Sequence, residues 1–175
     1  MRGAGGAANA RAPHEGSKGM DIFDLLKEEH DQIRDMLAVM MSERKKGDAF
    51  ERLRTRIEAH MGGEEEHVYP EIRAAGLRNE ILGALEEHHI ARIVLGELED
   101  MSDREESWAP KFKLFAELVE RHIREEERQV FPAAQKKIGR ARREELEAEY
   151  RQFAFPSAQA GTSLPRSESP FYREV

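Results

Sequence analysis

Residues 60–70 have the sequence HMGGEEEHVYP, and residues 122–132 repeat it as HIREEERQVFP. Five of the eleven positions are identical: the histidine, two adjacent glutamates, a valine and a proline. Residues 28–37, EEHDQIRDML, align in the same way on residues 86–95, EEHHIARIVL. An internal repeat indicates a structural unit that is used more than once. The chain therefore predicts two copies of a two-helix unit, each with two histidines and one glutamate in a fixed order.

The length and composition restrict the class of protein. A chain of 175 residues predicts one domain with its own hydrophobic core. It has no cysteine, which excludes disulfides, thiolate metal sites and thiol catalysis and suits the cytoplasmic location that we expect. The net charge of −7 argues against a nucleic-acid partner. No apolar run approaches the roughly 20 residues of a membrane span, and no secretory signal is expected, so we expect no membrane partner.

Apolar residues at helical spacing predict an all-α fold, an up-and-down four-helix bundle with a short extra C-terminal helix and disordered tails. The expected helices cover residues 20–46, 48–75, 79–101, 107–137 and 140–153. The bundle domain is expected over 20–153, with a disordered segment over 1–18 and a disordered tail over 154–175 that could bind a protein partner.

Single residues set the expected ends of these helices. Asp21 and Asp48 are candidate N-caps, and Gly76 is expected to end the second helix. Pro70 and Pro132 occupy matching positions in the repeat, inside the second and fourth helices. A proline inside a helix removes a backbone donor, so each is expected to kink or break its helix about one and a half turns after the glutamate.

The repeated residues have the chemistry of a metal site. A histidine and a glutamate four residues apart lie on one face of a helix. Four histidines and two carboxylates are too many ligands for one tetrahedral zinc ion, but they suit two metal ions bridged by the carboxylates. Nitrogen and oxygen ligands without sulfur favour iron, with manganese or zinc as alternatives. The candidate metal ligands are His30, His60, Glu64, His88, His122 and Glu126.

Other polar and aromatic residues have secondary interpretations. His89 is adjacent to His88 and could replace or support it, although the repeat selects His88. His67 is expected at the rim and His14 in the N-terminal segment. We expect Glu65 and Glu127 to hydrogen-bond the ligands or to form ion pairs between helices. We expect Tyr69 and Phe131 to pack under the site, although Tyr69 could instead reach a bound ligand or carry a radical.

The order His30, His60-x3-Glu64, His88, His122-x3-Glu126 resembles the hemerythrin-like HHE cation-binding domain, over about residues 20–137. The resemblance implies a four-helix bundle with two non-haem iron ions, bridged by the two glutamates and by an oxo or hydroxo group. It also implies O2 binding, O2 or iron sensing, NO and peroxide chemistry, or iron donation for iron–sulfur repair.

One position departs from the pattern of the oxygen carriers in that family. They have a fifth histidine four residues from the one on the third helix, and Arg92 stands at this position here. The iron-repair proteins share the four-histidine pattern but usually carry an N-terminal segment with cysteines, which this chain lacks.

Three hypotheses follow. The first is a di-iron protein that interacts with O2, NO or peroxide as a sensor or detoxifier, with weak catalase-like or NO-peroxidase activity left open. The second is iron storage or donation without turnover. The third is a helical interaction bundle with vestigial metal residues.

Overall fold

The computed structural model describes residues 19–43 and 46–154, and these residues form helices without any strand. This confirms the all-α prediction for the described part of the chain. The two tails that we expect to be disordered lie outside it, apart from Ala154. The described helices, including two π-helical segments, are α1 (Ile22–Glu43), α2 (Asp48–Gly63), η1 (Glu64–Val68), α3 (Tyr69–Ala74), α4 (Arg78–Asp100), α5 (Trp108–Glu125), η2 (Glu126–Val130), α6 (Phe131–Gln135) and α7 (Arg140–Ala154).

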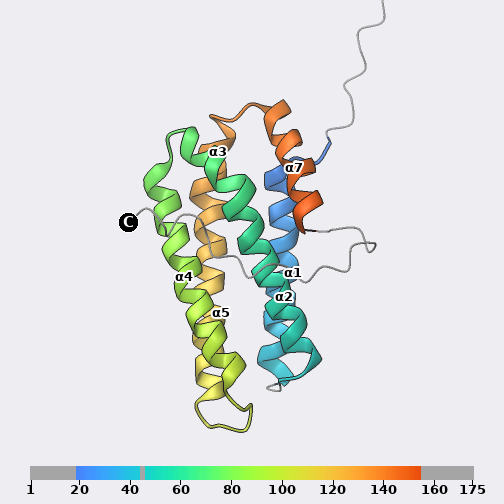
Figure 1. Ribbon diagram of the computed structural model, residues 1–175, viewed down its shortest axis with the longest axis vertical. Coiled ribbons are helices and arrows are strands. Elements are labelled where there is room, and N and C mark those ends of the chain that lie inside the picture. The colour runs from blue at the N-terminus through green and yellow to red at the C-terminus, as the bar shows by residue number, and fades with distance from the viewer. Residues whose placement is uncertain (1–18, 44–45, 155–175) are drawn as a thin grey trace, which may run out of the picture.

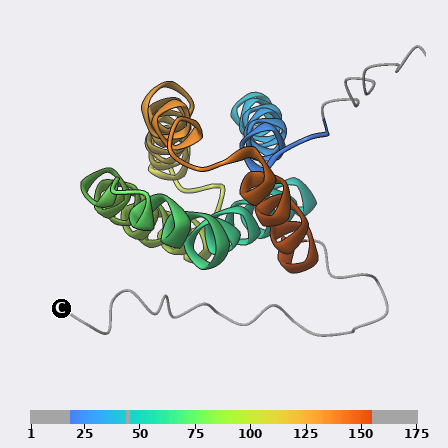
Figure 2. The same ribbon diagram turned by 90° about the horizontal axis from the view of Figure 1, so that it is seen from above.

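Helices α1, α2, α4 and α5 extend along the long axis of the molecule (Figure 1). Contacts join α1 to α2, α4 to α5 and α1 to α5. Helix α7 lies at one end of the molecule (Figure 1) and packs on α1, α2 and η1. The view from above shows α7 beside α1 and α2 (Figure 2). Within the described residues, no helix combines the length and the apolar character needed to cross a membrane.

The helix ends follow two of the three capping predictions. The side chain of Asp21 accepts a hydrogen bond from the backbone N–H of Phe23 at 3.0 Å, as an N-cap residue does. Gly76 has a φ of +86° after α3, a conformation that favours glycine. The prediction that Asp48 caps the second helix was wrong, because Asp48 lies in its first turn and Gly47 precedes it without a side-chain cap.

The prolines change the winding of their helices in an unexpected way. The second predicted helix continues through α2, η1 and α3, and the fourth through α5, η2 and α6. Each π-helical segment begins at the repeated glutamate itself, and Pro70 and Pro132 lie in the first turn of the helix that follows. The expected break one and a half turns after the glutamate is therefore replaced by a wide turn that starts at Glu64 and at Glu126. A first-turn proline needs no backbone hydrogen bond, which is why the path continues.

The core is divided into two apolar clusters. One contains Phe23, Tyr69 and Tyr150 at the end near α7, and the other contains Phe50, Trp108 and Phe115 towards the opposite end. Nine buried polar or charged side chains occur among the described residues, and most belong to the histidine and glutamate repeats. The fold thus surrounds a polar region with two apolar ones.

Gly63 allows α7 to pack closely against the end of α2. A Cβ atom at Gly63 would lie 2.5 Å from Cε2 of the buried Tyr150 ring. We therefore expect Gly63→Ala to lower the free energy of unfolding by about 1–3 kcal/mol, through overpacking. Gly83 on α4 is the control, because a Cβ there meets nothing within 4 Å. Gly83→Ala should raise stability by about 0.5–1 kcal/mol through helix propensity. Urea unfolding measures both, and equal effects would contradict the packing argument.

Candidate metal centre

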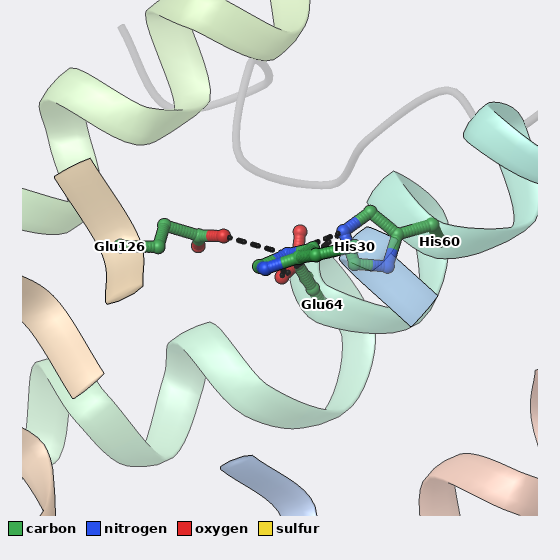
Figure 3. Close-up of side chains that lie close together, drawn as sticks. All are labelled: His30, His60, Glu64 and Glu126. Carbon is green, nitrogen blue, oxygen red and sulfur yellow. Dashed lines mark hydrogen bonds and ion pairs between the residues drawn. The ribbon is translucent and has the colours of Figure 1, made fainter. Parts of the chain in front are cut away.

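Four helical paths bring the six predicted ligands together in the interior. His30 comes from α1, His60 from α2, His88 from α4 and His122 from α5, while Glu64 and Glu126 begin the two π-helical segments. All six side chains are buried. Figure 3 shows four of them pointing toward one another. Two groups of their atoms could hold a metal ion: His30, His60, Glu64 and Glu126 in one, and Glu64, His88 and His122 in the other.

The histidines approach one another in two pairs. Nε2 of His30 lies 3.1 Å from Nε2 of His60, and Nε2 of His88 lies 3.0 Å from Nε2 of His122. Two nitrogens that bind the same metal ion at roughly 2.1 Å, with a right angle between the two bonds, would lie roughly 3 Å apart. The spacing of each pair therefore suits two adjacent ligands of one metal ion.

The two carboxylates lie between the pairs. Oε1 of Glu64 is 3.5 Å from Nε2 of His60, and its Oε2 is 3.4 Å from Nε2 of His88. One oxygen of Glu64 thus faces each pair. Oε2 of Glu126 is 3.4 Å from Nε2 of His30 and 3.5 Å from Nε2 of His122. Each carboxylate therefore lies between a histidine of one pair and a histidine of the other.

Each histidine also contacts a further glutamate through its other ring nitrogen. The Nδ1 atoms of His30 and His88 lie 3.0 and 2.8 Å from Glu127 and Glu65. The Nδ1 atoms of His60 and His122 lie 2.9 and 3.0 Å from Oε2 of their own partners, which are Glu29 and Glu87. A carboxylate at Nδ1 orients the ring and leaves Nε2 free to bind a metal ion.

We call these four residues, Glu29, Glu65, Glu87 and Glu127, the outer glutamates. The sequence indicated a role for only two of them. It predicted hydrogen bonds or ion pairs from Glu65 and Glu127, but it assigned no role to Glu29 or Glu87. The signal was present in the repeat, because a glutamate precedes both His30 and His88. Only the packing of α1 on α2 and of α4 on α5 shows that each of these glutamates contacts the histidine of the neighbouring helix.

Two arginines at matching positions of the repeat hold the outer glutamates. Arg34 pairs with Glu127 at 2.9 Å, and Arg92 pairs with Glu65 at 2.7 Å. Arg92 is the residue that stands where the oxygen carriers have a fifth histidine. The Arg92 guanidinium orients Glu65, so in this chain the residue at that position stabilises a glutamate that contacts a ligand histidine.

Tyr69 and Phe131 pack on the ligands, as expected, and the tyrosine also reaches the centre. The Tyr69 ring stacks on His88 with centroids 5.4 Å apart, and the Phe131 ring stacks on His30 at 5.8 Å. The Tyr69 hydroxyl donates to Oε1 of Glu126 at 2.9 Å. Phe131, the counterpart of Tyr69 in the repeat, has no hydroxyl and cannot make an equivalent hydrogen bond.

The two other described histidines, His67 and His89, are not part of the cluster of six ligands. His89 is exposed on α4 while His88 is buried, so His88 is the one of the two that faces the other ligands. The His67 ring packs on Phe153 at 5.2 Å. His14 lies outside the described residues.

Burial and mutual charge shift the acidity of the cluster. Burial raises the pKa of Glu64 well above its usual range, and the charge of Glu126 raises it further. Burial likewise lowers the pKa values of His60 and His88 to about 4, because it disfavours the charged imidazolium. For His30, burial is outweighed by Glu126 and Glu127, whose contacts raise its pKa. Hence His60 and His88 are neutral at pH 7, as metal ligands must be.

The donor set fits a pair of metal ions. Oε1 of Glu64 and Oε2 of Glu126 are buried and accept no hydrogen bond within the described residues. A buried carboxylate oxygen without a donor costs on the order of 1–3 kcal/mol. Oε1 of Glu64 lies beside Nε2 of His60, and Oε2 of Glu126 lies between Nε2 of His30 and Nε2 of His122, so a cation held by these histidines would compensate the charge of both oxygens.

The helices and the doubled histidine and glutamate set define a helical cation-binding protein. A family model described as the hemerythrin HHE cation binding domain matches residues 21–134. The chain belongs to this family. The match ends before α7, which begins at Arg140. Neither the comparison with curated proteins nor the comparison with solved structures found a match.

The pKa shifts predict that metal binding releases protons. Without metal, burial and the charge of Glu126 raise the pKa of Glu64, and contacts with Glu126 and Glu127 raise that of His30, so both groups favour their protonated forms. A metal ion displaces these protons, so its apparent affinity should rise as the pH rises from about 6 to 8. Anaerobic loading with Fe(II) at pH 7 should release roughly one to two protons per chain. Calorimetry in buffers of different ionisation enthalpy measures this number, and loading without proton release would contradict the assignment.

Proposed function

We propose that the protein binds two iron ions and interacts there with O2, NO or peroxide, as a sensor or detoxifier. The ligands in this proposal are His30, His60, Glu64, His88, His122 and Glu126. The observation that carries it is the geometry of the two histidine pairs, with the carboxylates of Glu64 and Glu126 between them. The bound iron would supply redox chemistry and affinity for small ligands.

The proposal includes an up-and-down four-helix bundle as the support of the site. The contacts of α1 with α2, of α4 with α5 and of α1 with α5 support this arrangement. A location in the cytoplasm is part of the proposal and rests on the sequence alone.

An apolar cavity beside the histidines supports a small uncharged ligand. It has a volume of about 20 Å³ and lies against His60, His88 and His122. A space of roughly 10–15 Å³ on this measure holds one water molecule, so the cavity has room for one molecule of diatomic size. Its other walls come mainly from apolar side chains, including Ile33, Ile57, Met61, Ala91, Leu118, Val119 and Ile123.

The protein residues would control the charge around the ligand. The Tyr69 hydroxyl donates a hydrogen bond at Glu126 and lies 3.2 Å from Nε2 of His88. Burial raises the pKa of this hydroxyl well above its usual value, so it stays protonated. It is therefore a fixed hydrogen-bond donor inside the cluster, and the apolar walls exclude bulk water.

Iron storage or donation is the second candidate function. It is favoured by the partial exposure of Glu87, whose side chain contacts His122 and is 18% exposed. Transfer of iron to a metal-free acceptor protein, without consumption of peroxide or NO, would distinguish this function from the first.

Metal content tests the ligand assignment. The wild-type protein should bind about two iron ions per chain, and saturation should raise its Tm by about 10 °C. His88→Ala should lose at least half of the iron and most of the Tm increase. His89→Ala is the adjacent control, because this exposed residue should leave both values unchanged. A vestigial site would instead show no iron uptake and equal Tm values in all three proteins.

The size of the apolar cavity should control access of small ligands. Ala91 and Val119 both line it and are buried. Ala91→Leu should fill the cavity and slow NO binding to the iron-loaded protein by about tenfold, which is roughly 1.4 kcal/mol in the barrier. Val119→Ala enlarges the cavity and should not slow binding. Stopped-flow absorption measures the rates on samples with equal iron content, and equal rates in all variants would exclude this route.

A further inference from the structure

The surroundings of His60 and His122, which are equivalent in the repeat, differ in their access to solvent. The side chains of His60 and of the glutamate at its Nδ1, Glu29, are 3% and 1% exposed. Glu87 and His122 are their counterparts in the repeat, with side chains 18% and 8% exposed. We call Glu29 with His60 the buried half, and Glu87 with His122 the open half, because Glu87 is partly exposed. The glutamates at His30 and His88 do not follow this difference, since the Glu127 and Glu65 side chains are 24% and 4% exposed.

Helix α7 covers the buried half. The Tyr150 hydroxyl donates to Oε2 of Glu29 at 2.6 Å, and the Tyr150 ring packs against Gly63. Arg56 adds an ion pair with Oε1 of Glu29 at 3.3 Å. Ion pairs of Arg142 with Glu71 at 2.6 Å and of Arg143 with Asp21 at 2.7 Å join α7 to the bundle.

The open half has an acidic pocket in place of such a cover. We define the acidic pocket by four carboxylates that line it, Glu80, Glu87, Glu125 and Glu126, and it also contacts His122. Its volume is about 240 Å³, which is room for several water molecules. No lysine or arginine lines it, although Arg121 pairs with Glu87 at 3.1 Å.

The repeat explains this difference in sequence terms. Gly63 has Glu125 as its counterpart, and His67 has Gln129. The glycine lets the Tyr150 ring approach, whereas Glu125 and Gln129 line the acidic pocket. Different residues at equivalent positions of the repeat thus allow α7 to cover one half and leave a pocket beside the other.

We infer that divalent cations enter and leave through the acidic pocket above His122, and that α7 retains the ion bound by His30 and His60. The inference rests on the proposed metal centre and adds an order of exchange to it. A pocket lined by carboxylates concentrates cations and accelerates their entry. The hydrogen bond from Tyr150 holds Glu29, which in turn orients His60, so release from the buried half requires α7 to move away. Tyr150 is a positioning residue in this arrangement.

The test uses the full chain loaded anaerobically with Fe(II), with two iron ions per chain measured first. Failure to load contradicts the proposed function itself. On mixing with excess ferrous chelator, we expect two release phases of equal amplitude, separated by at least tenfold in rate. A single phase from protein with two iron ions per chain overturns the inference and leaves the metal centre intact.

Variants assign the phases. Tyr150→Phe removes the hydrogen bond to Glu29 and should accelerate the slow phase about tenfold, because loss of such a contact weakens metal binding by roughly 10–100-fold. The fast phase should not change. Arg151→Ala, at an exposed adjacent position in α7, is the control and should leave both phases unchanged. Acceleration of the fast phase by Tyr150→Phe, or no acceleration at all, overturns the assignment.

A surface variant tests the entry route independently of α7 packing. Glu80→Gln with Glu125→Gln removes two charges from the acidic pocket and should slow Fe(II) uptake several-fold at low salt, with the difference lost at high salt. Glu51→Gln with Glu117→Gln makes the same charge change at exposed positions outside the pocket and should have no effect. Equal uptake rates for the two double variants at low salt overturn the route.

Discussion

The hydrogen bond between each histidine Nδ1 and a glutamate is the constraint on which the rest of the structure depends. Six ionisable side chains of the cluster are buried, and burial of such groups is favourable only when their charges and donors have partners. The four outer glutamates fix the rings, and the rings then direct Nε2 toward the two central carboxylates. This network requires α1, α2, α4 and α5 to place their histidines at the same level along the bundle.

The π-helical segments serve the same requirement. In each half, the ligand glutamate and the outer glutamate are adjacent in sequence, as Glu64–Glu65 and Glu126–Glu127. They contact different partners, because Glu64 faces both histidine pairs while Glu65 bonds Nδ1 of His88. Both lie at the start of a π-helical segment, and such segments are frequent at functional sites because they alter the direction of successive side chains. The prolines that follow then occupy first-turn positions at no cost in hydrogen bonds.

The symmetry of the ligands contrasts with the asymmetry of their surroundings. Arg34 and Arg92 hold equivalent glutamates, and Tyr69 and Phe131 stack on equivalent histidines. Outside this layer the halves diverge, since α7 covers Glu29 and His60 while the acidic pocket opens beside Glu87 and His122. The family match ends before α7, so this cover lies outside the part of the chain that the family describes. Two otherwise similar positions can therefore exchange a bound ion at different rates.

The sequence by itself determined the helical class, the approximate helix positions and the candidate ligands, because repeats and helical spacing are local properties of the chain. It also predicted that Glu65 and Glu127 contact other helices or ligands. It could not assign partners to Glu29, Glu87 or Tyr150, whose contacts join residues up to 121 positions apart. The π-helical winding was also decided by tertiary structure. A proline predicts a disturbed helix, but only the need to direct Glu64 and Glu126 into a shared interior determines where the wide turn begins.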